Sequence, residues 1–491
     1  EQDVGGKDNK RSDELRIRAS NLELAGLEGI RPLAAKLSPA LGDVWRSTQP
    51  SGKINTLALD IPLQAADKTR FQASWSDLAW KQWKLLPGAE HFSGTLSGSV
   101  ENGLLTASMK QAKMPYETVF RAPLEIADGQ ATISWLNNNK GFQLDGRNID
   151  VKAKAVHARG GFRYLQPAND EPWLGILAGI STDDGSQAWR YFPENLMGKD
   201  LVDYLSGAIQ GGEADNATLV YGGNPQLFPY KHNEGQFEVL VPLRNAKFAF
   251  QPDWPALTNL DIELDFINDG LWMKTDGVNL GGVRASNLTA VIPDYSKEKL
   301  LIDADIKGPG KAVGPYFDET PLKDSLGATL QELKLDGDVN ARLHLDIPLN
   351  GELVTAKGEV TLRNNSLFIK PLDSTLKNLS GKFSFINSDL QSEPLTASWF
   401  NQPLNVDFST KEGAKAYQVA VNLNGNWQPA KTGVLPEAVN EALSGSVAWD
   451  GKVGIDLPYH AGATYNIELN GDLKNVSSHL PSPLAKPAGE P

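Results

Sequence analysis

The sequence has no cysteine, only six histidines and fewer basic than acidic residues. Without cysteine, the chain cannot form disulfides, thiolate metal sites or a cysteine nucleophile. Its 47 lysines and arginines against 60 aspartates and glutamates give a net charge of −13, which argues against a nucleic-acid partner because such partners are bound by a basic face. The histidines stand singly, without paired metal-ligand spacing or a nucleophile elbow. We therefore expect no enzymatic activity, no cofactor and no metal site.

Long hydrophobic runs are also missing. The most apolar stretch, "PWLGILAGI" at 172–180, is far shorter than the roughly 20 residues that a membrane-spanning helix needs. The chain starts at Glu1, without a methionine or a signal-like segment, and both of its ends are polar. We expect a water-soluble segment of a larger protein.

Alternation of apolar and polar residues is what the sequence has in abundance. The stretch "LALDIPL" at 57–63 returns as "LHLDIPL" at 343–349. In an extended strand the four apolar residues of each copy share one face. The single substitution, Ala58 against His344, falls on the opposite face. The apolar face is therefore what the two copies have in common.

Similar period-two runs fill most of the chain, and each is short and ends in Gly, Asn, Asp or Pro. A second landmark occurs three times, with Asn102, Asn268 and Asn387 at its turns. These observations predict a mainly β chain built as a degenerate tandem repeat of roughly 110–170 residues per unit. We place the repeats at residues 1–185, 186–312 and 313–430, with a partial fourth at 431–491. Short helices are expected near 32–45, 196–209, 320–333 and 435–443.

The role of the apolar strand faces stays open on physical grounds alone. One-sided alternation is what the packed core of a β-sandwich or solenoid needs. The same pattern suits a sheet that curls into a trough and leaves its apolar face for a ligand.

Residues 173–271 carry a resemblance to a known family. Its markers are a Y-x-P before a helix, a YL-x-x-AI helix end, the turn "GGNPQLFPY" and a W-P-x-L. These fall at Tyr191 and Pro193, at Tyr204, Leu205, Ala208 and Ile209, at 222–230, and at Trp254, Pro255 and Leu257. In these features the chain resembles the AsmA-like proteins of Gram-negative bacteria, and among them a large member of the family. The resemblance is specific here and looser elsewhere.

The resemblance implies a fold, a function and partners. The expected fold is an elongated repeating β-groove, or β-taco, of antiparallel strands with a lengthwise apolar groove and a few short helices. The expected function is intermembrane lipid transport in the periplasm, in which the groove shields phospholipid acyl chains. The implied partners are phospholipid, an inner-membrane anchor outside this segment and a partner in the outer membrane. The alternative is a structural or scaffolding β-solenoid of the envelope, with a packed interior and no lipid cargo.

The apolar strand faces supply the predicted groove lining. The residues are Leu57, Leu59, Ile61, Leu63, Phe237, Val239, Val241, Leu243, Ile262, Leu264, Phe266, Ile302, Ile306, Leu343, Leu345, Ile347, Leu349, Phe383, Phe385, Val419, Val421, Leu423, Ile467 and Leu469.

Overall fold

A computed structural model describes residues 14–26, 39–65, 68–84 and 86–490. Strands make up 62% and helices 15%, and the strand pairs are antiparallel, which confirms the predicted mainly β fold with few short helices. The chain divides into two compact units. Unit 1 comprises Glu1–Lys247, Asp261–Met273 and Pro293–Glu298, and unit 2 comprises Phe248–Leu260, Lys274–Ile292 and Lys299–Pro491. The division into four repeats remains a prediction.

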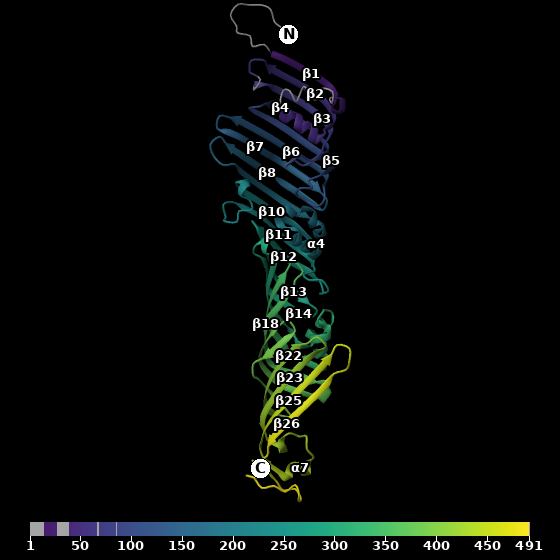
Figure 1. Cartoon of the computed structure of the whole chain (residues 1–491), viewed down its shortest axis with the longest axis vertical. Coiled ribbons are helices and arrows are strands. Elements are labelled where there is room, and N and C mark those ends of the chain that lie inside the picture. Colours follow the sequence, from purple (N-terminus) through teal and green to yellow (C-terminus); the bar gives the residue numbers. More distant parts are fainter. Residues whose placement is uncertain (1–13, 27–38, 66–67, 85, 491) are drawn as a thin grey trace, which may run out of the picture. The chain divides into compact units, whose positions relative to one another are not determined.

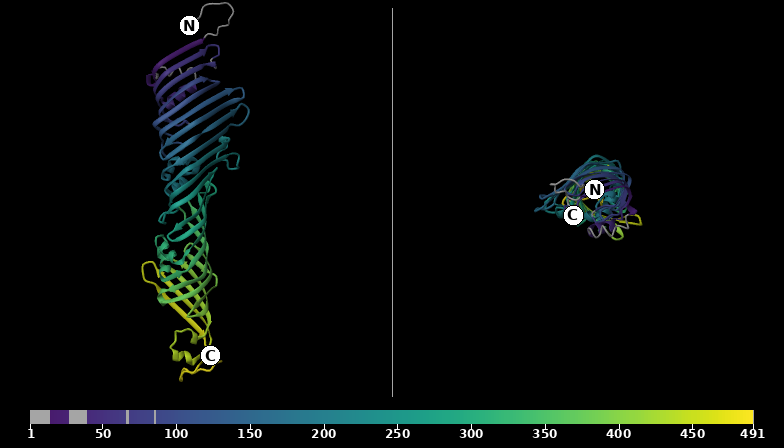
Figure 2. Two further views of the ribbon diagram at one scale, coloured as in Figure 1. Left: turned by 180° about the vertical axis from the view of Figure 1, so that it is seen from behind. Right: turned by 90° about the horizontal axis from the view of Figure 1, so that it is seen from above.

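Unit 1 contains a meander in which each strand pairs with the next along the chain, from β1 to β10. Figures 1 and 2 show these strands following one another obliquely, from purple to teal. The strands are β1 (Glu14–Glu23), β2 (Ser51–Pro62), β3 (Arg70–Trp80), β4 (Ala89–Ser99), β5 (Asn102–Met114), β6 (Leu124–Asn138), β7 (Gly141–Ala153), β8 (Val156–Pro167), β9 (Trp173–Thr182) and β10 (Ile209–Gly223).

Strands β11 (Gln236–Phe248), β12 (Leu257–Ile267) and β13 (Gly270–Leu280) contribute residues to both units. In unit 2 the pairing is again mostly sequential, with β19 paired to both β20 and β21. Its strands are β14 (Val283–Ile292), β15 (Lys299–Pro309), β16 (Leu333–Asp336), β17 (Asp338–Pro348), β18 (Thr355–Ile369), β19 (Ser374–Ile386), β20 (Asp389–Ser392), β21 (Leu395–Trp399), β22 (Gln402–Glu412), β23 (Ala416–Trp427), β24 (Leu443–Gly445), β25 (Val447–Pro458), β26 (Thr464–Asp472) and β27 (Val476–Ser478).

Bulges interrupt many strands at residues with positive φ. Asp77 and Asn364 have φ of 57° and 54°, a left-handed conformation that Asn and Asp adopt more readily than most residues. The backbone N–H of Asp77 donates to Ser93 Oγ at 3.2 Å, and that of Asn364 donates to Ser380 Oγ at 2.9 Å. Each bulge shifts the register, so the next residue on the same face of the sheet comes three positions later instead of two.

The repeated asparagine turns are a second local structure that recurs along the chain. The side-chain oxygen of Asn268 accepts from the backbone N–H of Phe237 at 2.9 Å, and that of Asn387 accepts from Ala356 at 2.8 Å. The backbone N–H of each asparagine donates back to the carbonyl oxygen of the same partner. Asn102 differs, because its N–H donates to Ser99 Oγ. Two of the three landmark turns are therefore the same structure.

The helices are shorter than the sequence predicts. The helix expected at 196–209 is split into α3 (Glu194–Met197) and α4 (Lys199–Ala208) by Gly198, whose φ is 83°. The segment at 320–333 forms a short π-helix, η7 (Lys323–Gly327), followed by α6 (Ala328–Glu332). At 435–443 the helix is α7 (Glu437–Ala442). The first predicted helix corresponds to α2 (Pro39–Thr48), and its part at 32–38 lies outside the described residues.

Helix α4 is fixed to unit 1 by apolar and ionic contacts. It packs against β10 and buries Leu201 and Leu205 completely. From the β5–β6 connection, Arg121 donates to Glu194 of α3 and, at 2.6 Å, to Asp203 of α4. The helix therefore belongs to the body of the unit and does not stand free.

Candidate functional site

The strands of unit 1 carry one continuous apolar face. Residues that pair directly across antiparallel strands share a face of the sheet. Following the register from β1 to β10, one row of partners contains only apolar residues and a single glycine. The row is Ala19, Leu57, Ala73, Leu96, Leu105, Ile133, Gly146, Phe162, Ile176 and Tyr221. At about 4.8 Å per strand, this row extends about 43 Å.

This apolar face of unit 1 is only partly covered. Leu57, Leu96, Leu105, Ile133 and Phe162 all remain half-buried. Side chains in a core sandwiched between two layers would be almost fully buried, as Leu201 and Leu205 of α4 are. The described residues therefore leave this face accessible to a ligand with an apolar body.

Much of the apolar face of unit 2 is filled by its own side chains, whereas the buried cluster formed on β4, β5 and β6 of unit 1 by Ala89, Met109, Ala112 and Ile126 is smaller. A buried cluster joins residues of β17, β18, β19, β21, β22 and β25, and Leu395 in it is 1% exposed. A second cluster places Leu326 of η7 against Tyr417 and Val419 of β23. The strands of unit 2 thus enclose a packed interior over these positions.

The predicted lining residues fall into three groups. Seven are buried: Leu243, Ile262, Leu264, Phe266, Ile302, Ile347 and Val419. Fourteen are half-buried: Leu57, Leu59, Ile61, Phe237, Val239, Val241, Ile306, Leu343, Leu345, Leu349, Phe383, Phe385, Val421 and Leu423. Three are exposed: Leu63, Ile467 and Leu469. Contact of these residues with a ligand remains a prediction.

Sequence reasoning missed much of the open face, including Leu96, Leu105 and Ile133. A signal was present in β4, where Phe92, Gly94, Leu96 and Gly98 alternate with polar residues. The glycines weaken that signal because glycine is not read as apolar. The bulges hide others, as between Gly146 and Ile149, where the register shifts within β7.

The opposite face is polar, and hydrogen bonds between side chains link its strands. Three histidines pair with aspartates: His91 with Asp77, His157 with Asp150 and His344 with Asp303, at 3.0, 2.7 and 2.8 Å. Across the described ranges, no group of three or more His, Asp or Glu residues is placed to hold a metal ion. These pairs link neighbouring strands.

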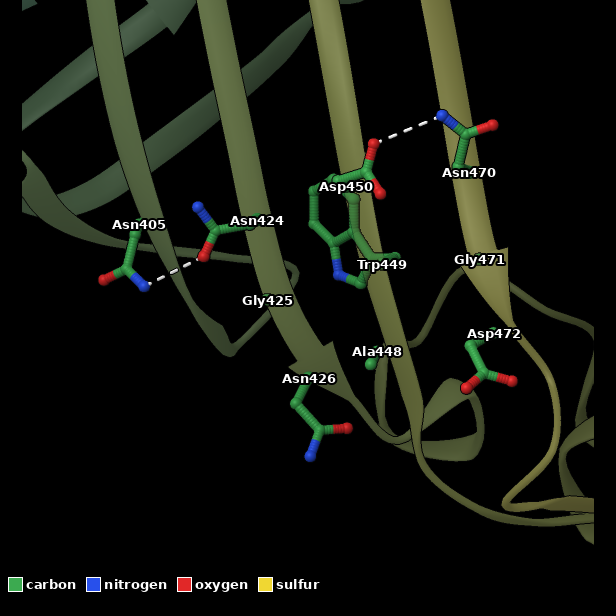
Figure 3. A pocket seen from close by; sticks show the side chains of 10 residues that line it. All are labelled: Asn405, Asn424, Gly425, Asn426, Ala448, Trp449, Asp450, Asn470, Gly471 and Asp472. Carbon is green, nitrogen blue, oxygen red and sulfur yellow. Dashed lines mark hydrogen bonds between the residues drawn. The ribbon is translucent and has the colours of Figure 1, made fainter.

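A hollow of about 700 Å³ lies over β22, β23, β25 and β26 of unit 2 (Figure 3). Amide and carboxylate side chains line it and bond across the strands. Asn405 Nδ2 donates to Asn424 Oδ1 at 3.0 Å, and Asn470 Nδ2 donates to Asp450 Oδ2 at 3.2 Å. Because these groups pair with one another, we interpret the hollow as a strand-linking surface.

Asp145 on the polar face of β7 makes a testable contribution to stability. Burial alone would raise the pKa of its carboxyl, but hydrogen bonds donated by Arg163 at 2.6 Å and Gln143 at 2.6 Å outweigh burial and lower the pKa. A lowered folded-state pKa stabilises the fold above the unfolded value of about 3.9, and this stabilisation is lost as the pH falls through the folded value. We expect Asp145→Asn to cost about 2 kcal/mol at pH 7.

Urea unfolding at several pH values checks this expectation. The difference between Asp145→Asn and the unsubstituted chain should begin to shrink as the pH falls below about 4, where the carboxyl of the unfolded chain takes up a proton, and should shrink further as the pH falls through the lower pKa of the folded chain. Asp128→Asn, at an exposed position of β6, is the matched control and should change stability little. A loss that is the same at pH 7 and pH 3 would show that the charge of Asp145 contributes nothing.

Comparison with known proteins identifies a family over nearly the whole chain. The sequence model of the family described as YhdP protein matches residues 2–491. No solved structure matches the chain. Among the described residues, no helix combines the length and the apolar character needed to cross a bilayer.

Proposed function

Because this chain belongs to the YhdP family of AsmA-like envelope proteins, we propose that it shields the acyl chains of phospholipids moving between the inner and outer membranes of a Gram-negative cell. The chain acts in the periplasm as part of a protein anchored in the inner membrane, with a partner in the outer membrane. The family is not a known enzyme family, and the proposed transport needs no chemical step.

The single observation that supports the proposal most is the open apolar row of unit 1, from Ala19 on β1 to Tyr221 on β10. An acyl chain of about 16 carbons loses roughly 0.8 kcal/mol per methylene, or about 12 kcal/mol, on leaving an apolar phase for water. A continuous apolar surface removes most of this barrier. The phosphate head group must keep its polar partners, which a groove open to water on one side allows.

A scaffolding role is the second candidate. The packed clusters of unit 2, centred on Leu395 and on Tyr417, favour it because a filled interior leaves no room for an acyl chain at these positions. In that case the apolar side chains would stabilise the fold and would not bind lipid.

Lipid analysis distinguishes the two candidates. The chain is purified from a Gram-negative host, extracted with organic solvent and examined by mass spectrometry. We expect co-purifying phospholipid well above the amount found with an unrelated β-rich protein purified in the same way. Phospholipid at the level of that control would refute the transport proposal and favour the scaffold.

A further inference from the structure

Aromatic side chains on the apolar face of unit 1 lie over glycines of the neighbouring strand. Trp135 of β6 is paired with Gly103 of β5, and Phe162 of β8 is paired with Gly146 of β7. A Cβ atom added to either glycine would lie 2.1 Å from the ring opposite it. The two rings therefore occupy the space that any other residue at these glycines would need.

The position of Trp135 is fixed by further contacts. Its indole Nε1 donates to the carbonyl oxygen of Ser99 at 3.0 Å. Its ring stacks against Phe71 of β3, with 6.0 Å between the ring centroids and 19° between the planes. Phe71 is paired with Gly98, which is itself paired with Gly103. The Trp135 ring thus lies over Gly103, with the Phe71 ring stacked against it.

The backbone conformation at Gly103 and Gly146 does not require glycine. Gly98 has a φ of 146°, but Gly103 and Gly146 have no left-handed φ, so alanine fits their backbone conformation. The space beneath the ring, however, is too small for the methyl group of alanine. Because the Ser99 bond and the Phe71 stack hold Trp135 from the sides, the direction left for a displaced ring is away from the sheet.

We infer that Gly103 and Gly146 determine the clearance of the lipid path by letting Trp135 and Phe162 lie flat on the apolar face. The inference rests on the proposed transport of acyl chains. A methyl group at either glycine lifts the ring into the space that an acyl chain occupies. Gly358 of unit 2 is also paired with an aromatic residue, Phe385, but there a Cβ would first meet the backbone carbonyl oxygen of Arg342, at 2.1 Å, and the ring at 2.6 Å.

The polar face of unit 1 supplies a matched control. Gly175 of β9 lies next to the ring of Trp173, and a Cβ there would come within 2.2 Å of it. Gly175 is paired with Arg163, the partner of Asp145 on the polar face. Gly175→Ala therefore introduces a similar overlap between a methyl group and a tryptophan ring on the face that the acyl chain does not contact.

The test measures binding of a phospholipid with a photoreactive acyl chain, presented in phosphatidylglycerol vesicles, to the purified chain. We expect Gly103→Ala to reduce crosslinking about tenfold, the effect of withdrawing about two methylene groups from apolar contact. Gly175→Ala should crosslink as the unsubstituted chain does. The double variant Gly103→Ala/Trp135→Leu should recover most of the crosslinking, because the displaced ring is gone.

Each outcome decides a separate point. Crosslinking by Gly103→Ala at the unsubstituted level, an equal loss in Gly175→Ala, or no recovery in the double variant would overturn the inference while leaving the proposed function in place. An unsubstituted chain that takes up no phospholipid would overturn both. If thermal melting shows that Gly103→Ala fails to fold, Gly146→Ala with and without Phe162→Leu repeats the test at the second pair.

Discussion

Leu105→Asp is expected to reduce phospholipid crosslinking about thirtyfold, because a hydrated carboxylate replaces about 2 kcal/mol of apolar contact in the lipid path. Leu105 lies at the centre of the open row, paired with Leu96 and Ile133. The side chain is half-buried, so the new charge keeps access to water. The melting temperature should therefore fall only slightly.

The measurement places a photoreactive amino acid at position 133, on the apolar face, and compares it with position 132, on the polar face. The control substitution is Thr106→Asp, whose side chain is exposed on the polar face of the same strand. Thr106→Asp should leave both crosslinking and melting unchanged. Equal crosslinking from positions 132 and 133, or unfolding of Leu105→Asp, would contradict an open lipid path on this face.

The same type of substitution should have a different consequence in unit 2. Leu395→Asp is expected to lower the free energy of unfolding by about 4–5 kcal/mol, because Leu395 is 1% exposed and the carboxylate would be buried without a partner. Leu395 is paired with Val406 on β22 and packs with Leu362, Leu376 and Leu404 in the buried cluster. These neighbours offer no hydrogen-bond donor from their side chains.

Hydrogen exchange with mass spectrometry locates the effect, and urea unfolding gives its size. Peptides from β18 to β25 should lose protection in Leu395→Asp. Thr396→Asp, at the next residue and on the exposed face, should retain it. If Leu395→Asp melted like the unsubstituted chain, the interior of unit 2 would not be packed, and the difference between the two units would disappear.

The fold class followed directly from the sequence. Period-two alternation with frequent turn residues predicts antiparallel strands with one apolar side, because successive side chains of a strand point to opposite faces. The paired stretches at 57–63 and 343–349 lie in β2 and β17 except for their last residues, as the alternation predicts. The landmark asparagines also mark real turns, because Asn268 and Asn387 form the same pair of hydrogen bonds.

The pairing register of neighbouring strands could not be predicted from the sequence. Bulges at residues such as Asp77 shift the apolar phase by one position, and their local signal is only an Asn or Asp within a strand. The position of the Trp135 ring over Gly103 depends on which residues of β5 and β6 are paired with each other. No single strand contains that information.

The sequence by itself determined that each strand has one apolar side, since alternation is a property of neighbouring residues. Ile61 and Ile347 occupy the same position in the two repeated stretches and are the same residue type. Only the tertiary structure decided that Ile61 keeps part of its surface exposed while Ile347 is buried. The physical reason is that burial depends on what packs over a face, and those atoms come from strands and helices distant in the chain.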